Sequence, residues 1–373
     1  MSPDGPDRSD ADPSSLDAMS VDASEVLDGS RSDASSWMDA SVTDASYVDA
    51  PDAATPVLPS CLQPVGSVMN TVGARGQSVA AEGTMAYLGL TSGARGIQIF
   101  DVANPAAPIP LGVFRTDSGP GMLAPNSNDV LGITVRSRYA YLATYFGGMV
   151  IVDVSDPMNP SFVGGLSLPR ETWAIALQGN RAFVANHTLG LVVVDISNEA
   201  APVQVTNLPL AGSSMALHID GTRLYVAAHT DLHILDISNP DAPSQIGQLT
   251  TVDGIFYGVW SSGNGYAYVI DKSRRELLTI DVMSIPPTVV QVRPSDHALD
   301  PRSIDGNGMS IVVGDGTGTS GRVRSFENTP PTPMLASDLS ANERVFDIEV
   351  DGELVFGATF DGAVAIWRFT SCP

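Results

Sequence analysis

The chain has 373 residues, of which 43% are apolar and only 16% are charged. Its 42 acidic residues outnumber the 19 basic ones and give a net charge of −23, which disfavours nucleic acid and anionic membrane surfaces as partners. No apolar run approaches the roughly 18 residues of a membrane span, and the first 30 residues lack the apolar core of an export signal.

The first segment of the chain, residues 1–60, is the most acidic part. It carries thirteen acidic residues and two basic ones, Arg8 and Arg31. It repeats short Asp-Ala-Ser fragments, has few large apolar side chains and shows no helical or strand period. Such a composition cannot bury enough surface to offset the entropy of ordering. We therefore expect a disordered acidic spacer over 1–60 and a folded domain over 61–373.

The rest of the chain is built from a repeat. Five segments read alike, namely GIQIFDVANPAAP, GMVIVDVSDPMNP, GLVVVDISNEAAP, DLHILDISNPDAP and LLTIDVMSIPPT. Their shared aspartates are Asp101, Asp153, Asp195, Asp236 and Asp281. Two weaker copies follow, with Phe326 and Arg368 at the aspartate position. Successive copies are 41 to 52 residues apart, and the longest interval holds the insertion RTDSGPGMLAPNSND.

Each copy supplies four strand-like runs separated by turn residues. In the second copy these runs are YAYLATY, GMVIVDV, PSFVGGLSL and WAIAL. Runs of Val, Ile and Leu without strict alternation indicate strands that are buried on both faces, as blades packed between blades require. No stretch has a helical period. Seven copies of four strands predict an all-β, seven-bladed β-propeller.

These motifs carry a resemblance to a known family. GMVIVDVSDPMNP and its copies resemble the LVIVD repeat, which is found mainly in bacterial and archaeal surface or exported proteins. The resemblance covers 61–373, with five clear copies and two degenerate ones. It implies a propeller fold, an exported setting and a role in adhesion or ligand binding, and it supplies no catalytic residues. The acidic segment also resembles spacers that hold bacterial lipoproteins away from a membrane, which implies a tether through an N-terminal anchor that the printed sequence does not show.

The two ends of the chain complete one copy between them. Four of the five clear copies have a proline seven residues after the aspartate, namely Pro108, Pro160, Pro202 and Pro243, and the last copy stops before reaching this position. Pro64 occupies the missing proline position, and both Cys61 and Cys372 fall four residues after the aspartate position. We therefore expect a strand from about Pro64 to Val68 to close the last blade, locked by a Cys61–Cys372 disulfide. The alternative is two unrelated thiols. A disulfide implies an oxidising compartment.

The repeated aspartates have two interpretations: a ring of acids for chemistry, or a structural role. A carboxylate at the end of a buried strand needs hydrogen-bond donors, and the turn that follows offers backbone N–H groups. The structural interpretation is therefore favoured for Asp101, Asp153, Asp195, Asp236 and Asp281.

No motif predicts a catalytic residue, a metal site or a cofactor. His187 and His229 hold equivalent loop positions and, with Asp231, are the best candidate metal ligands, but two imidazoles do not form a dense ligand motif. The glycine-rich DGTGTSGR lacks the lysine of a phosphate loop and is interpreted as a hairpin turn. A Gly-x-Ser-x-Gly nucleophile elbow is also absent from the sequence.

Alignment of the copies predicts one face rich in aromatic and arginine side chains, the residue types that binding surfaces favour. The candidate binding residues are Tyr145, Arg170, Trp173, His187, His229, Tyr257, Arg302, Arg344 and Phe360. All fall in or beside loops that lead into the first strand or join the second strand to the third. We expect the long insertion to lie on the same face.

The sequence therefore favours a non-catalytic binding or adhesion module, extracellular, periplasmic or at the cell surface, that recognises a protein or glycan through one propeller face. We expect a monomer with no nucleic-acid partner and no membrane span. The first alternative is an enzyme, a hydrolase or lyase acting on a polymer at the mouth of the central channel. The second is a purely structural surface protein. Fold alone cannot choose, because propellers host all three.

Overall fold

The computed structural model describes most of the region predicted to fold, namely residues 60–118, 128–187, 189–294, 300–317 and 320–372. The expected spacer over 1–60 lies outside these ranges except for Ser60, and so does the middle of the long insertion, 119–127. Within the described ranges every regular element is a strand, and no helix there could cross a membrane.

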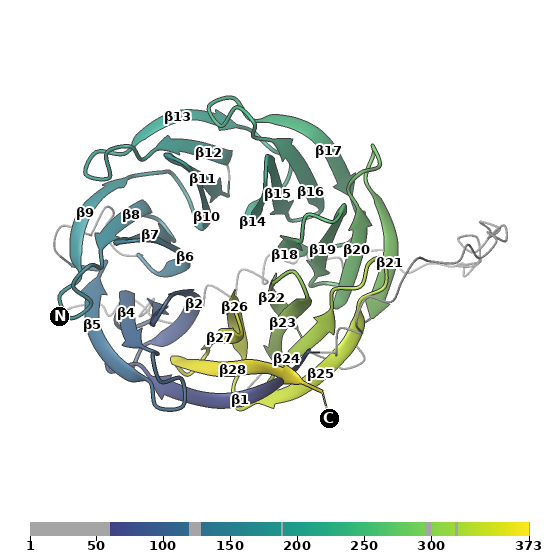
Figure 1. Ribbon diagram of the computed structural model, residues 1–373. Coiled ribbons are helices and arrows are strands. Elements are labelled where there is room, and N and C mark those ends of the chain that lie inside the picture. Colours follow the sequence, from purple (N-terminus) through teal and green to yellow (C-terminus); the bar gives the residue numbers. More distant parts are fainter. Residues whose placement is uncertain (1–59, 119–127, 188, 295–299, 318–319, 373) are drawn as a thin grey trace, which may run out of the picture. The chain divides into compact units, whose positions relative to one another are not determined.

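In the described part of the chain, twenty-eight strands form seven antiparallel sheets of four strands, arranged as blades in a ring (Figure 1). Blades 1 to 3 consist of β2 (Arg75–Glu82), β3 (Met85–Thr91), β4 (Gly96–Asp101) and β5 (Ile109–Arg115); β6 (Val130–Arg136), β7 (Tyr139–Thr144), β8 (Gly148–Asp153) and β9 (Ser161–Leu166); and β10 (Thr172–Gln178), β11 (Arg181–Asn186), β12 (Gly190–Asp195) and β13 (Val203–Leu208). Blades 4 and 5 consist of β14 (Ser214–Asp220), β15 (Arg223–Ala228), β16 (Asp231–Asp236) and β17 (Ser244–Thr250); and β18 (Phe256–Ser261), β19 (Tyr266–Asp271), β20 (Glu276–Asp281) and β21 (Thr288–Pro294). Blades 6 and 7 consist of β22 (Pro301–Gly306), β23 (Ser310–Thr317), β24 (Ser320–Glu327) and β25 (Met334–Ala341); and β26 (Val345–Asp351), β27 (Leu354–Thr359), β28 (Ala363–Ser371) and β1 (Ser60–Met69). The predicted seven-bladed propeller is confirmed.

The strands of a blade differ in burial because they lie at different distances from the propeller axis. The second and third strands are almost wholly buried, as in β11 and β12, while the fourth strand β13 is largely exposed. The apolar side chains of adjacent blades pack into shared clusters, such as the one that joins Tyr141, Val184 and Val194. Each fully buried Val or Leu contributes roughly 1.5–3 kcal/mol, so the repeat motif is chiefly a packing motif.

The first strands surround the axis and approach one another closely. A Cβ atom added to Gly132 of β6 would lie 2.6 Å from the carbonyl oxygen of Trp173 on β10, closer than side-chain carbons approach backbone. Glycine is therefore required at this contact between blades 2 and 3.

The last blade is closed by the N-terminal strand, as expected. β1 pairs antiparallel with β28, with Pro64 opposite Trp367 and Val68 opposite Val364, and Figure 1 shows it at the rim of the ring. The strand is longer than the five residues predicted, because the pairing extends over Ser60–Met69. Its start is fastened to the chain end by the Cys61–Cys372 disulfide, whose Cα atoms are 4.9 Å apart.

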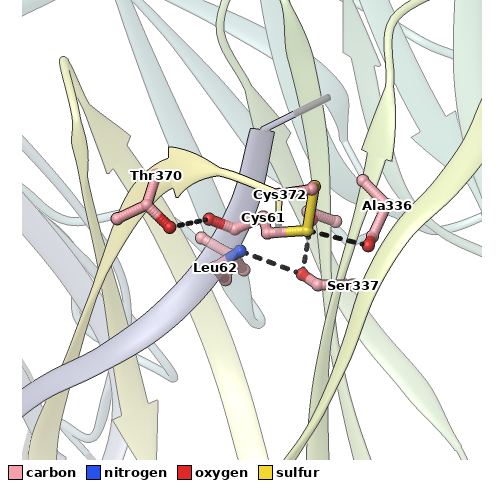
Figure 2. Close-up of a disulfide and its surroundings, with 7 residues drawn as sticks. Cys61, Leu62, Ala336, Ser337, Thr370 and Cys372 are labelled. Atoms are coloured by element: carbon pink, nitrogen blue, oxygen red, sulfur yellow. Dashed lines mark hydrogen bonds between the residues drawn. A yellow bond between two sulfur atoms is a disulfide. The ribbon is translucent and has the colours of Figure 1, made fainter. Parts of the chain in front are cut away.

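The surroundings of the disulfide join blade 7 to blade 6 (Figure 2). The amide N of Leu62 donates to Ser337 Oγ at 3.1 Å, and the Cys61 sulfur lies 3.2 Å from the carbonyl oxygen of Ala336. Both partners belong to β25, the outer strand of blade 6. Thr370 Oγ1 donates to the carbonyl of Cys61 at 3.3 Å. The closing strand therefore binds two blades at once.

Candidate binding site at the channel mouth

One face of the propeller collects the residues of the predicted site. In blade 3 the antiparallel register pairs Thr172 with Asn186 and Asn186 with Gly190, so the start of β10, the end of β11 and the start of β12 lie at one end of the sheet. The other blades repeat this register. We call this end the loop face. All nine candidate residues lie at this end: Trp173, Tyr257 and Arg302 are the second residues of their strands, and the other six lie just before or after a strand.

Every first strand carries a β-bulge at its second or third residue, close to the loop face. In each blade one residue between two register positions has no partner on the second strand. These seven residues are Gln77, Leu131, Trp173, Met215, Tyr257, Arg302 and Phe346. Bulges commonly re-aim a side chain next to a functional site. We call this set the mouth ring.

The mouth ring opens into a cavity of about 350 Å³ on the propeller axis. All seven members line it, and the remaining lining residues follow them along the first strands of all seven blades. The volume falls in the range of small-molecule pockets, roughly 300–1,000 Å³. The cavity is therefore built jointly by every blade, with one bulged side chain from each at its rim.

Aromatic rings meet across the mouth. The rings of Trp173 and Tyr257, from blades 3 and 5, lie edge to face with centroids 6.5 Å apart. Lys272, just after β19, places its Nζ atom 4.7 Å from the Tyr257 ring centroid. Aromatic edge contacts and cation–π contacts each stabilise such an arrangement by roughly 0.5–1.5 kcal/mol. These contacts stabilise the edge-to-face arrangement of the two rings.

A second group of stacked rings continues around blades 6, 7 and 1. The guanidinium of Arg302 lies 4.9 Å from the Phe346 ring centroid. Phe360 has Arg344 at 3.9 Å and Arg75 at 4.5 Å from its ring centroid. This protein has a net charge of −23, yet three arginines and Lys272 gather at this part of the loop face.

Two buried donors at the mouth have no acceptor among the described residues. Trp173 is 8% exposed and its Nε1–H is unpaired; Arg302 is 7% exposed and its Nε–H is unpaired. The Nη2 atom of Arg302 is occupied, since it donates to Asp300 at 2.7 Å. A buried donor left without a partner costs on the order of 1–3 kcal/mol. A ligand that supplies acceptors at these two atoms would recover that cost.

Acidic side chains line the cavity beneath the mouth. Asp305 on β22 and Asp347 and Glu349 on β26 all line it. Burial raises the pKa of Asp305 and of Asp347 to about 7. Burial, followed by the neighbouring carboxylates, also raises the pKa of Glu349. The cavity therefore has Arg302, which is paired with Asp300, at its rim and carboxyl groups on its wall.

The two aspartates also tie blades together. Asp305 accepts a hydrogen bond from the amide of Val350 at 2.7 Å, and Asp347 accepts one from the amide of Val79 at 3.0 Å. Each bond joins neighbouring first strands. No sequence pattern had singled out these acids, because they belong to no motif and only the ring geometry brings them to one cavity.

Four of the nine candidates lie outside the mouth. Tyr145 packs edge-on against Phe146 at 4.4 Å between ring centroids. Arg170 and His229 are exposed and have positive φ angles of 65° and 54°. His187 Nε2 shares a 3.0 Å hydrogen bond with Ser213 Oγ. The structure therefore gathers Trp173, Tyr257 and Arg302 at the mouth, with Arg344 and Phe360 stacked beside it.

The candidate metal ligands do not converge on a common site. Asp231 accepts hydrogen bonds from Thr230 Oγ1, Thr250 Oγ1 and Gln248 Nε2, which lowers its pKa against the opposing effect of burial. In the ranges that the structure describes, no three His, Cys, Asp or Glu side chains form a group that could hold a metal ion.

The five repeat aspartates each accept a hydrogen bond from the amide two residues later. The distances are 2.8 or 2.9 Å. These bonds close the turn that follows the third strand, and the carboxylates are half-buried. They lie at the end of the blade opposite the mouth, since each ends a third strand.

Alignment by the repeat aspartate missed four members of the mouth ring, namely Gln77, Leu131, Met215 and Phe346, and it also missed Lys272 beside Tyr257. Phe346 occupies the same bulge position as Trp173 and Arg302, and Lys272 follows a second strand as His187 does. An alignment anchored on the first strands would have found both.

The architecture defines the class of the protein: a seven-bladed β-propeller with four-stranded blades. Sequence similarity further identifies the type of repeat that builds the blades. Residues 128–166, 169–208 and 211–251 match the LVIVD repeat, and these stretches correspond to blades 2, 3 and 4. The protein is therefore a β-propeller that contains LVIVD repeats. No curated protein matches the sequence.

Solved structures share the fold. The β-propeller domain of Cps50 (Swd1) from Myceliophteria thermophila has 14% identity and a TM-score of 0.64, with 83% of this chain and 100% of that chain covered. The WD40 β-propeller domain of Doa1 has 10% identity and a TM-score of 0.62, with 83% and 97% covered. The computationally designed Ika8 protein has 10% identity and a TM-score of 0.57, with 82% and 99% covered. At such identities the likeness concerns the fold alone.

Proposed function

We propose that this propeller is a non-catalytic binding module that works outside the cell or at its surface and recognises a protein or glycan through the mouth ring. The observation that carries the proposal is the bulge in every blade, which directs seven side chains at one cavity, among them Trp173, Tyr257 and Arg302. Tryptophan, tyrosine and arginine are the residues that dominate binding energy at interfaces. The disulfide fits an oxidising compartment.

A binding screen against glycans and extracellular proteins tests the proposal. The full chain is compared with a Trp173→Ala/Tyr257→Ala variant and with a Tyr139→Ala control. Tyr139 starts β7 at the opposite face and stacks with Arg138 at 5.2 Å, so it matches the aromatic–cation pair of the mouth. We expect the mouth variant to lose the ligand and the control to keep it. A ligand that both variants retain would place the binding surface elsewhere.

A second candidate function follows from the three acids in the cavity. Burial raises the pKa of all three, to about 7 for Asp305 and Asp347. Carboxyl groups with a raised pKa are suited to general acid–base catalysis, so a hydrolase or lyase acting on a polymer is the alternative. Against it, the backbone hydrogen bonds of Asp305 and Asp347 give both a structural role. Release of new chain ends from a bound polysaccharide, abolished by Glu349→Gln, would establish the enzyme.

A further inference from the structure

The cavity at the mouth has two chemically different ends, and this polarity selects a class of ligand. The rim presents the unpaired N–H donors of Trp173 and Arg302, and the wall beneath it presents carboxyl groups. Along β22, Arg302 and Asp305 are three residues apart, which corresponds to about 10 Å of strand. A ligand that fits both ends carries an anionic acceptor at one end and hydroxyl groups at the other.

The anionic end is set by Arg302 and Trp173. The Nε–H of Arg302 and the Nε1–H of Trp173 are both buried without an acceptor in the described part of the chain. Arginine recognises carboxylates through planar pairs of N–H donors. The Nη2 atom of Arg302 is held by Asp300 at 2.7 Å, so the side chain is fixed before any ligand arrives.

The flat walls of the mouth come from Trp173 and Tyr257. Their rings are held at an angle of 74° to each other and offer apolar faces beside the donors. A pyranose ring has C–H faces that suit aromatic surfaces, and its hydroxyl groups reach past them. The acids lower in the cavity can exchange hydrogen bonds with those hydroxyl groups, because a carboxyl group accepts when ionised and donates when protonated.

We propose that the mouth ring binds a carboxylated sugar, a uronic acid residue of an anionic polysaccharide, with its carboxylate at Arg302 and Trp173 and its hydroxyl groups toward Asp305 and Glu349. The proposal rests on the binding function above and names its ligand class. A cavity of about 350 Å³ admits a sugar residue or a chain end rather than a threaded polymer. An acidic peptide side chain supplies the carboxylate but not the array of hydroxyl groups that the acidic wall requires.

Calorimetric titration of the full chain with three sugars of one shape tests this inference. The probes are digalacturonate, its methyl diester and α-1,4-galactobiose. We expect digalacturonate to bind at least about tenfold more tightly than either uncharged sugar, since a charge-assisted hydrogen bond contributes about that factor or more. Rising salt should weaken only the digalacturonate complex.

Three variants locate the site. Trp173→Phe keeps the ring and removes the Nε1–H, so the affinity for digalacturonate should fall by about three- to tenfold. Arg302→Gln should weaken digalacturonate by about tenfold or more and leave galactobiose unchanged. Trp260→Phe is the matched control, because Trp260 is 4% exposed, stacks on Tyr268 and lies outside the cavity lining. Melting temperatures of all variants show whether each one folds.

Three other results would contradict the proposed uronic-acid ligand, each for a different reason. If the three sugars bind with equal affinity and Trp173→Phe loses that affinity, the mouth ring binds glycans but has no specificity for a carboxylate. Displacement of digalacturonate by inorganic sulfate at equal concentration indicates a general anion site. If none of the three sugars binds at millimolar concentration, a sugar ligand is excluded. The proposed binding function would then hold only if a protein partner bound in a way that depends on Trp173 and Tyr257.

Discussion

The carboxylate of Asp347 accepts a 3.0 Å hydrogen bond from the amide of Val79, although the two residues are 268 positions apart. This bond joins the first strand of blade 7 to the first strand of blade 1. At the outer rim, the Cys61–Cys372 disulfide and the β1–β28 pairing close the same ring a second time. The propeller is therefore fastened both at its axis and at its rim.

The rim closure predicts a stability effect of the disulfide. The bridge spans 311 residues, and the chain-entropy argument gives about 5–6 kcal/mol as an upper figure for a loop of that length. We expect reduction, or the Cys61→Ser/Cys372→Ser variant, to lower the melting temperature while the room-temperature circular dichroism spectrum stays unchanged. Reductant should have no effect on the variant. Equal melting temperatures for oxidised and reduced protein would show that β-strand pairing alone secures the rim.

The closing strand itself predicts a sharp dependence on the N-terminal boundary. A chain that starts at Pro59 retains all twenty-eight strands, whereas a chain that starts at Val72 lacks β1 and exposes the edge of β28. Exposed strand edges promote aggregation. We expect the first chain to be monomeric and to melt like the full protein, and the second to aggregate in light-scattering and size-exclusion measurements. A soluble monomer without β1 would contradict the closing role of this strand.

The sequence predicted the blades better than it predicted the site. Strand positions follow from local signals: the apolar runs around Val150 and Val192 and the turns after each repeat aspartate recur along the chain. Ring closure was also predictable, because Pro64 and Cys61 supply positions that the C-terminal copy lacks. Both inferences depend only on counting along the chain.

The mouth depends on geometry that counting does not supply. The bulge that turns Tyr257 and Phe346 toward the axis is a property of the packed ring, and no residue type marks it in advance. The candidates Arg170 and His229 lie on the correct face but are exposed in loops away from the cavity lining. The acids of the cavity wall were missed because Asp305 and Asp347 become neighbours only when blades 6 and 7 stand side by side.

The repeat aspartate predicts a stability effect without a binding effect. Asp195 accepts the amide hydrogen of Ser197 at 2.8 Å and lies 3.1 Å from Arg181. The hydrogen bonds from Ser197, with a smaller effect of Arg181, lower its pKa. We expect Asp195→Ala to lower the melting temperature and to leave ligand affinity unchanged, and Asp195→Asn to have a smaller effect because its carbonyl can still accept. If Asp195→Ala loses ligand binding while its melting temperature is unchanged, Asp195 has a role in binding and not in stability.

The last prediction concerns the pH dependence of stability, for which two groups of aspartates act in opposite directions. The hydrogen bond from Arg138 lowers the pKa of Asp153 to about 2, so its stabilising effect is present above its unfolded value of about 4 and is lost as the pH falls toward 2. Burial raises the pKa of Asp347 and of Asp305 to about 7. The folded state then binds more protons than the unfolded state between about pH 4 and pH 7, so stability falls as the pH rises through that window.

We therefore expect the melting temperature to be highest near about pH 4–5 and to decline on both sides. Thermal unfolding followed by circular dichroism from about pH 3 to pH 9 measures the profile.

Asp347→Asn removes one titrating group while its side-chain oxygen can still accept from Val79, so it should flatten the decline between about pH 4 and pH 7. Asp153→Asn is the matched control, because it should flatten only the acidic limb. Asp305 contributes to the raised pKa of Asp347, and both aspartates contribute to that of Glu349. The flattening is therefore partial in the single variant and larger in Asp305→Asn/Asp347→Asn. If the decline in melting temperature between about pH 4 and pH 7 is unchanged in both variants, these carboxyl groups titrate at ordinary values and the cavity wall is fully ionised at neutral pH.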